Sequence, residues 1–368
     1  FPDRETHFSD IEMARNNVDF LIVGQGIAGS LLAWHLLRLG ASIIVIDDNH
    51  AGAASLVAAG IINPISGIRM VPSWEFNRFY PEACNTYRQL ESDLGTQYYN
   101  EMSLIRFIQS NAETERFNSR KDSSEFAQFL KTVNKPGLKP EIIHDPLGSF
   151  TLSPAAYVNI PRLVIDLGKY FDQKKLRLTT QFQYDDLKIE SDKVIWKDWI
   201  AKRIIFCEGY RGRENPWFKS LPFKPAKGEV LTLETDTPLL PRTILNGGKW
   251  LLPLNEYRCL AGATFSWDPL NHEPSERGKN EILNGLRSFT HLNFKVLNHV
   301  AGIRPAMDNT LPVIEQHLRF PALVIFNGLG AKGALIAPYC TRILSDELCR
   351  MVKFGKICVL PGSEVFNY

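Results

Sequence analysis

The sequence predicts an α/β protein in which both ends of the chain build one discontinuous α/β domain, and a smaller α+β domain lies between them. Near the N-terminus, an apolar strand, a glycine-rich turn and a helix follow one another, which is typical of a βαβ unit. Residues 227–267 alternate with period two, the pattern of antiparallel strands with one open face. An apolar strand at 322–326 precedes a second glycine-rich turn and a helix.

Length and composition exclude several classes of protein. The 368 residues exceed one average domain, and 44% hydrophobic with 22% charged residues are ordinary globular values. The net charge of +2 is too small to indicate a nucleic-acid-binding or anionic membrane surface. The six cysteines are scattered without a C-x-x-C pair and the histidines stand apart, so we expect reduced thiols and no metal site.

The N-terminal residues carry no targeting signal that we recognise. Residues 1–17 are charged and lack an apolar core, so we expect no signal peptide, and Met13 is a candidate natural start. The longest apolar stretch, 20–34, is shorter than the roughly 20 residues that span a bilayer. We therefore expect a cytoplasmic protein without a membrane segment.

The first βαβ unit is defined by its glycines. A strand at 18–23 leads into Gly24, Gly26 and Gly29, the pattern G-x-G-x-x-G, and a helix with apolar residues at helical spacing follows to Gly40. The first glycine permits the tight turn, the second lets the backbone approach a pyrophosphate, and the third allows close packing of helix and strand. The pyrophosphate would lie at the helix N-terminus, where free N–H groups favour negative charge.

An acidic pair completes this nucleotide-binding pattern. The next strand, 42–46, ends at Asp47, which lies 23 residues after Gly24 and is the candidate acceptor for ribose hydroxyls. Asp48 is the alternative. The glycine pattern alone does not distinguish NAD from FAD.

The remaining elements follow in order along the chain. We expect a long Gly/Ala-rich loop at 49–72, a helix at 74–94, helical patches within 110–140, strands from 176 to 207, the antiparallel region 227–267, a helix at 275–290 and a final helix from 333 to about 354.

Several further segments, taken with the glycine pattern, resemble one known family. They are the small-residue loop 52–60 (GAASLVAAG), the strand end 204–209 (IIFCEG), the segment 224–230 (KPAKGEV), the strands around 250–253 and 262–264, the element 301–314 (AGIRP…LPVI) and the turn 328–334 (GLGAKGA). Together they resemble the D-amino-acid oxidase-type FAD oxidoreductases, especially glycine oxidase, sarcosine-oxidase-like enzymes and the oxidase domain of the tRNA aminomethyl-uridine modification enzyme. At 207–208, Cys-Glu replaces the family's Ala-Thr.

The resemblance implies a Rossmann-like FAD-binding domain and a substrate domain built on an antiparallel sheet. It assigns 13–90, 149–222 and 299–368 to the FAD-binding domain, and 91–148 and 223–298 to the substrate domain. No cysteine stands near the 301–314 element, where covalent flavoenzymes of this family carry one, so non-covalent FAD is expected. The adenine contact falls near 182–187, with no residue fixed.

The glycine pattern and the resemblance together give the cofactor-binding candidates. These are Gly24, Gly26, Ile27, Ala28, Gly29, Asp47, Asp48, Ser55, Ala58, Ala59, Gly60, Ile62, Gly209, Gly328, Gly330, Lys332, Gly333 and Ala334.

For the substrate, the resemblance implies Arg304 and Trp250. A guanidinium matches the two oxygens of a carboxylate, so Arg304 would hold the carboxylate of an amino acid; a structural salt bridge is the alternative. Trp250 would line the substrate pocket, and a core position is its alternative. The implied reaction passes hydride from the substrate carbon to flavin N5 and leaves an imine that water hydrolyses. We therefore assign no catalytic acid or base to the protein.

The expected partners are a small amine or amino acid and an electron acceptor, either oxygen or another compound. Two other functions stay open. The turn 328–338 is similar to that of the tRNA-modifying oxidase, which acts on a glycine-like arm of a modified uridine, although the net charge of +2 gives no strong phosphate-binding surface. The second open function is that of a protein that binds flavin but catalyses no reaction. The sequence does not indicate the oligomeric state.

Overall fold

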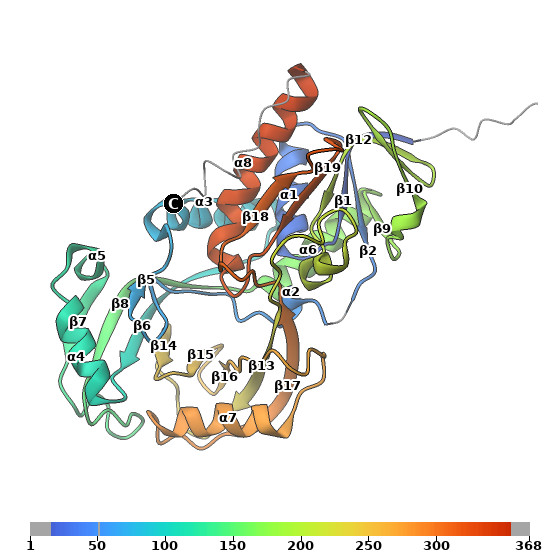
Figure 1. The fold of residues 1–368 in the computed structure, drawn as a ribbon. Helices are drawn as coiled ribbons and strands as arrows, with labels where there is room; N and C mark the ends of the chain where they lie inside the picture. The colour runs from blue at the N-terminus through green and yellow to red at the C-terminus, as the bar shows by residue number, and fades with distance from the viewer. Residues whose placement is uncertain (1–15, 51, 355–368) are drawn as a thin grey trace, which may run out of the picture.

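Two large β-sheets with helices packed around them, and a third sheet of two short strands, make up the described part of the protein (Figure 1). The computed structural model describes residues 16–50 and 52–354. The predictions for residues 1–15, including Met13, and for the end of the chain after 354 lie outside the described residues.

The first sheet has eight strands within the described part of the chain, in the order β10-β11-β12-β1-β2-β9, with β19 beside β12 and β18 beside β19. Its central strands β1, β2, β9, β12 and β19 run parallel, as buried apolar strands joined by helices do. The bounds are β1 (Asn16–Val23), β2 (Ile43–Asp47), β9 (Arg177–Thr179), β10 (Leu187–Ile189), β11 (Val194–Trp196), β12 (Trp199–Phe206), β18 (Val313–Gln316) and β19 (Leu323–Asn327).

The second sheet has nine strands among the described residues, in the order β17-β13-β16-β15-β14-β6-β8-β3, with β7 paired to β8. It is antiparallel, as 227–267 predicts, except that β14 runs parallel to β6. The bounds are β3 (Ile61–Ile62), β6 (Tyr99–Phe107), β7 (Leu130–Asn134), β8 (Ser149–Val158), β13 (Ala226–Glu234), β14 (Thr243–Asn246), β15 (Trp250–Pro253), β16 (Arg258–Gly262) and β17 (Lys295–Arg304).

Two details differ from the sequence-based expectations. Strand β8 pairs with β6 along its whole length and so belongs to the second sheet, whereas the predicted division places 149–158 with the FAD-binding domain. The loop 49–72 contains short elements of its own: α2 (Ala54–Val57), β3, β4 (Ile65–Ser66) and β5 (Val71–Pro72). Each of these elements is only two to four residues long. Segments this short carry no readable hydrophobic period, so the sequence predicts a loop there.

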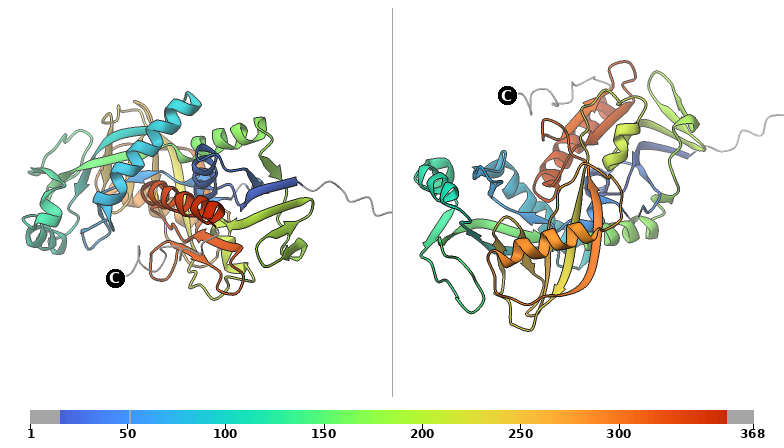
Figure 2. Two further views of the ribbon diagram at one scale, coloured as in Figure 1. Left: turned by 90° about the horizontal axis from the view of Figure 1, so that it is seen from above. Right: turned by 60° about the horizontal axis from the view of Figure 1, so that its bottom comes forward.

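The helices cover both sheets. α7 (Glu276–Arg287), orange in Figure 2, packs on β13 at the outer face of the second sheet. α1 (Ile27–Arg38) and α8 (Gly333–Phe354) pack against each other, and α3 (Phe76–Leu94) packs on α8. The others are α4 (Asn111–Arg120), α5 (Ser124–Ala127) and α6 (Ile160–Gln173), with 3-10 turns at Tyr184–Asp186 and Gly209–Glu214.

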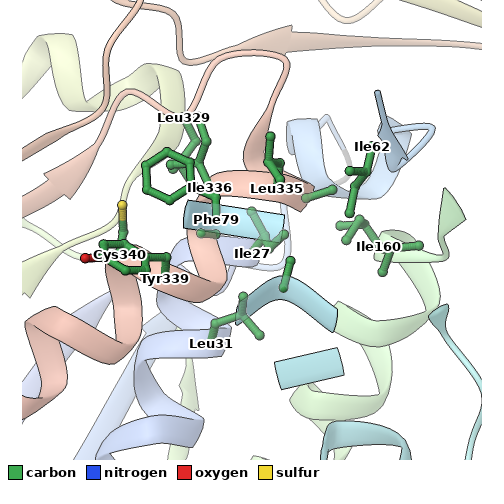
Figure 3. Close-up of a cluster of buried hydrophobic side chains, with 14 of the residues drawn as sticks. Ile27, Leu31, Ile62, Phe79, Ile160, Leu329, Leu335, Ile336, Tyr339 and Cys340 are labelled. Atoms are coloured by element: carbon green, nitrogen blue, oxygen red, sulfur yellow. The ribbon is translucent and has the colours of Figure 1, made fainter. Parts of the chain in front are cut away.

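The N-terminal ends of α1 and α8 meet over one apolar core. In Figure 3, Leu335 of α8 lies beside Ile27 of α1, with Ile62 and Ile160 close by. Each of these four side chains is buried. The core therefore fixes two helix N-termini next to each other. Within the described residues, no helix is long and apolar enough to cross a membrane.

Candidate functional site

A cavity of about 360 Å³ lies between the two sheets. One wall comes from the carboxyl ends of β1, β2 and β12, where ligands of parallel α/β sheets bind. The other comes from β13, β15 and β17 of the second sheet. The α2 segment and the turn before α8 complete it.

The N-terminus of α1 opens onto this cavity. Gly24 has φ +98°, and a side chain at Gly29 would lie 1.9 Å from the Gly24 carbonyl oxygen, so both positions require glycine. Gly26 provides no side-chain cap for the helix, and Ser55 Oγ accepts the Ile27 N–H at 2.9 Å. Gly24, Gly26, Ile27, Ala28 and Ser55 line the cavity, whereas Gly29 packs the helix on the strand. Because the N-cap residue Gly26 has no side chain, the N–H groups after Ile27 receive no cap from it and suit an anion.

The two acidic candidates have different surroundings. Asp47 Oδ2 accepts the Gln25 N–H at 2.6 Å and its Oδ1 accepts the Asn49 N–H at 2.8 Å. These bonds fix the carboxylate at the cavity and leave lone pairs for further hydroxyl donors. Asp48 forms an ion pair with Arg211 at 2.6 Å. The geometry favours Asp47 for ribose, and that role stays a prediction.

The small-residue segment follows the cavity wall. Ser55, Ala58, Ala59 and Gly60 line the cavity. Gly60 has φ +67°, and a side chain there would meet the Val158 carbonyl oxygen at 1.8 Å. Ile62 is fully buried and does not line the cavity, whereas Ile61 does. Since β3 alternates its two faces, only one of these neighbours can face the cavity.

In the turn before α8, too, some of the predicted cofactor-binding residues line the cavity and others do not. Gly330, Gly333 and Ala334 line the cavity, as does Gly209 after β12. Gly328 packs toward Met307, because a side chain there would lie 2.6 Å from Met307 Cγ. Lys332 turns away and donates to Ser66 Oγ at 3.1 Å. Its burial lowers the pKa of this lysine.

Arg304 ends β17 at the cavity, with only carbonyl partners for its guanidinium. Nη1 donates to the Lys227 carbonyl at 3.2 Å and Nη2 to the Thr264 carbonyl at 3.1 Å. One face of the guanidinium lies on Gly228, where an added Cβ would be 2.1 Å from Nη2. In the described part of the chain, no carboxylate lies within ion-pair distance of Arg304, and burial lowers its pKa. A partly buried cation at the cavity wall is thus left without a counter-ion among the described residues.

Trp250 begins β15 and lines the same cavity as Arg304. Its ring lies against Gly262, where an added Cβ would be 2.7 Å from Cζ2, and it lines the cavity while packing on the core. Both of its predicted surroundings, pocket and core, are therefore present at once.

Some cavity-lining residues were not singled out from the sequence. Thr180, Gln181, Phe182 and Tyr184 lie at the end near Asp47 and overlap the segment where an adenine contact was expected. His50 lines the cavity and its Nε2 lies 3.1 Å from His272 Nε2. These two histidines are 222 residues apart, so no local pattern indicates their contact.

Glu208 is the residue that the sequence could have identified, because it stands where the family has a smaller neutral residue. It lines the cavity. Tyr184 Oη donates to its Oε1 at 2.6 Å and Asn215 Nδ2 to its Oε2 at 2.9 Å. Burial raises the pKa of Glu208 to about 7, and the two hydrogen bonds oppose the shift.

This shift gives the apoprotein a pH-dependent stability. The folded state holds the proton more tightly than the unfolded state, so the free energy of unfolding falls as pH rises from about 4.5 to about 7. We expect a fall of about 2 kcal/mol that Glu208→Gln removes, measured by urea unfolding at several pH values. Glu256→Gln, which removes an exposed carboxylate away from the cavity, is the control. An unchanged pH slope in Glu208→Gln contradicts the assignment.

Comparisons with known proteins agree with this architecture. The FAD dependent oxidoreductase family matches residues 19–347. An uncharacterized oxidoreductase, YurR of Bacillus subtilis strain 168, is 24% identical over 90% of this chain and 94% of its own length. The bifunctional tRNA 5-methylaminomethyl-2-thiouridine biosynthesis protein MnmC of Marinobacter nauticus is 22% identical over 90% of this chain, which spans 55% of that protein.

A solved structure shows the same fold. Glycine oxidase from Geobacillus kaustophilus superimposes with a TM-score of 0.78 over 91% of this chain and 95% of its own, at 19% identity. The predicted α/β fold with a Rossmann-like FAD-binding domain is confirmed, as is FAD as the cofactor. Because the family match spans most of the chain, this protein belongs to the FAD dependent oxidoreductase family.

Proposed function

We propose that the protein oxidises the carbon–nitrogen bond of a carboxylated amine, an amino acid or an N-substituted amino acid, with non-covalently bound FAD. Arg304 is the observation that carries this proposal. It is a partly buried cation whose hydrogen-bond partners are carbonyl groups, and it lines the cavity together with the glycine-rich turns. A substrate carboxylate would supply the missing negative charge.

The residues around the cavity fit FAD. The N-terminus of α1 and the close backbone at Gly26 suit the pyrophosphate, and Asp47 suits the ribose. Ser55, Ala58, Ala59, Gly60 and Gly209 would lie along the cofactor, and so would the α8 turn at Gly330, Gly333 and Ala334. Bound FAD supplies the acceptor for the substrate's hydride.

The protein's own part is to bind and orient the substrate. Arg304 would hold the carboxylate in the plane of its guanidinium, and Trp250 would limit the amine's position from the side. The other cavity residues near them, Ala263, Gly302 and Pro305, have no side chain that titrates. In the described part of the site, the chain thus offers positioning and no acid or base at this end.

Absorption spectroscopy tests the cofactor and the reaction in one preparation. We expect an oxidised flavin spectrum that stays in the supernatant after heat precipitation, and bleaching under anaerobic conditions by amines such as glycine, sarcosine or iminodiacetate. Readmitted oxygen then shows whether oxygen or another compound accepts the electrons. Flavin that remains with the pellet contradicts non-covalent binding, and failure of every carboxylated amine to bleach it contradicts the reaction.

The likeness to MnmC favours a second candidate, an oxidase that acts on a modified tRNA. The relative's name includes tRNA biosynthesis, and this chain spans about half of it. A salt-dependent affinity for tRNA would support this candidate. The proposed small-molecule activity predicts no such affinity.

A further inference from the structure

We propose that Phe265 and Trp267 form an aromatic subsite, which selects carboxylated amines that also bear a flat apolar ring. The inference rests on the proposed function, because it takes Arg304 as the anchor of the substrate carboxylate. It adds the chemical class of the remainder of the substrate.

The Phe265 ring lies next to the anchor, the Trp267 ring packs against Phe265, and both rings are exposed outside the set of residues that line the cavity. Phe265 is 53% and Trp267 56% exposed, and they are the only phenylalanine and tryptophan among the exposed large hydrophobic side chains of the described residues. Their ring centroids are 5.0 Å apart at 75°. The Phe265 ring lies 5.3 Å from Arg304 Cζ, on the guanidinium. A ligand that binds Arg304 by its carboxylate and extends outward from the cavity would therefore meet Phe265 first and Trp267 next to it.

The backbone holds these rings in an exposed position. Before Phe265, Thr264 Oγ1 accepts the Glu229 N–H at 2.9 Å. After it, Ser266 and Lys227 exchange two backbone hydrogen bonds, at 2.8 and 3.1 Å. Ser266 Oγ then donates to the Asp268 carbonyl at 2.7 Å. These hydrogen bonds fix the backbone of the segment, so the exposure of the two aromatic rings is part of an ordered structure. Because the segment is already ordered, it loses little conformational entropy when a ligand binds.

The arrangement of Lys227 adds to this support. Its side chain is 4% exposed, with Nζ 2.7 Å from Asn271 Oδ1 and 3.6 Å from Glu229 Oε1. Glu229 in turn accepts the Ser275 N–H at 2.8 Å. Hydrogen bonds to Glu229 therefore tie both ends of segment 264–275 to β13.

The charges of the segment favour a small ligand over RNA. Residues 264–275 contain Asp268 and Glu273 and no lysine or arginine. Phosphate groups would meet exposed carboxylates there, whereas a neutral ring would stack or pack edge to face. An aryl-bearing amino acid or an N-arylmethyl amino acid fits these surroundings.

Ligand binding to the holoenzyme tests the subsite without turnover. Phenylacetate and acetate share a carboxylate and carry no amine, so neither can be oxidised at a carbon–nitrogen bond. We expect phenylacetate to perturb the flavin spectrum at a lower concentration than acetate does. Trp267→Ala should weaken phenylacetate about 5-fold and leave acetate within about 2-fold.

Two further variants complete the comparison. Phe265→Leu keeps an apolar group over Arg304 and should weaken phenylacetate in the same way. Tyr257→Ala removes a 42% exposed aromatic ring at the β15–β16 turn and should change neither ligand. Flavin content shows that each variant is folded. Equal affinities for the two ligands in the wild type, or unchanged phenylacetate binding in Trp267→Ala, would overturn the subsite.

The two hypotheses fail separately. If phenylacetate is preferred and Trp267→Ala abolishes the preference, but no amine bleaches the flavin, the subsite stands and the proposed oxidation falls. If sarcosine and N-benzylglycine bleach the flavin with equal kcat/KM, the oxidation stands and the subsite falls. Binding only to tRNA, with no response to phenylacetate, would overturn the subsite as well.

Discussion

Arg304→Gln is expected to lower kcat/KM for carboxylated amines about 100-fold. The variant keeps a polar side chain that can donate to the Lys227 or Thr264 carbonyl, but it removes the charge and the two-pronged geometry that match a carboxylate. Loss of a charge-assisted pair of hydrogen bonds costs about 3 kcal/mol. Anaerobic stopped-flow reduction of the flavin measures the effect. The kcat/KM of Arg304→Lys should lie between the values of the wild type and of Arg304→Gln.

Stability distinguishes this binding role from a structural one. The Arg304 guanidinium is partly buried and has no carboxylate partner in the described residues, so its desolvation opposes folding, and Arg304→Gln should leave the thermal midpoint of the holoenzyme unchanged or raise it. Arg258→Gln, on β16 of the same sheet, removes an exposed pair with Glu234 and serves as the control. Wild-type reduction kinetics in Arg304→Gln, or a large fall in its midpoint, would contradict the assignment.

The sequence predicts best what local chemistry decides. The strand, glycine turn and helix from β1 to α1 follow from residues that are neighbours in the chain, and the structure has them within a residue or two. The same holds for α8, whereas α7 ends at Arg287, three residues before the predicted end, and the strands β13 to β16 fill the region from Ala226 to Gly262 that the period of two indicates. Each of these elements has its own hydrophobic period or a glycine with a required conformation.

Tertiary pairing decides the remainder. The sequence does not show that β14 lies parallel to β6 or that β8 joins the second sheet, because register depends on partners that are distant in the chain: Thr243 of β14 pairs with Ser103, and Ser149 of β8 pairs with Phe107. The orientations of Ile62 and Lys332, which turn from the cavity, depend on packing in the same way. Arg304 could be named from its motif, but the absence of a counter-ion in the described site became visible only in the structure.

The glycine turn itself gives the second large effect: Gly29→Ala should yield protein with less than about one tenth of the wild-type flavin. The added Cβ would lie 1.9 Å from the Gly24 oxygen and 3.3 Å from Ile22 Cγ2. The clash is with backbone, so α1 must move off β1, at a cost of about 3 kcal/mol. This movement displaces the helix N-terminus from the cavity. The flavin-to-protein ratio and urea unfolding of the apoprotein measure both effects.

Gly40→Ala provides the matched control, because it separates steric overlap from backbone strain. Gly40 has φ +78° at the other end of the same helix, and an added Cβ there meets no atom within 4 Å. Alanine at 40 should cost about 1 kcal/mol through its unfavourable φ and leave the flavin content unchanged. If Gly29→Ala and Gly40→Ala lose stability equally and both retain flavin, close packing of α1 on β1 does not govern cofactor binding. A loss of flavin confined to Gly29→Ala would tie the cofactor to the position of this one helix end.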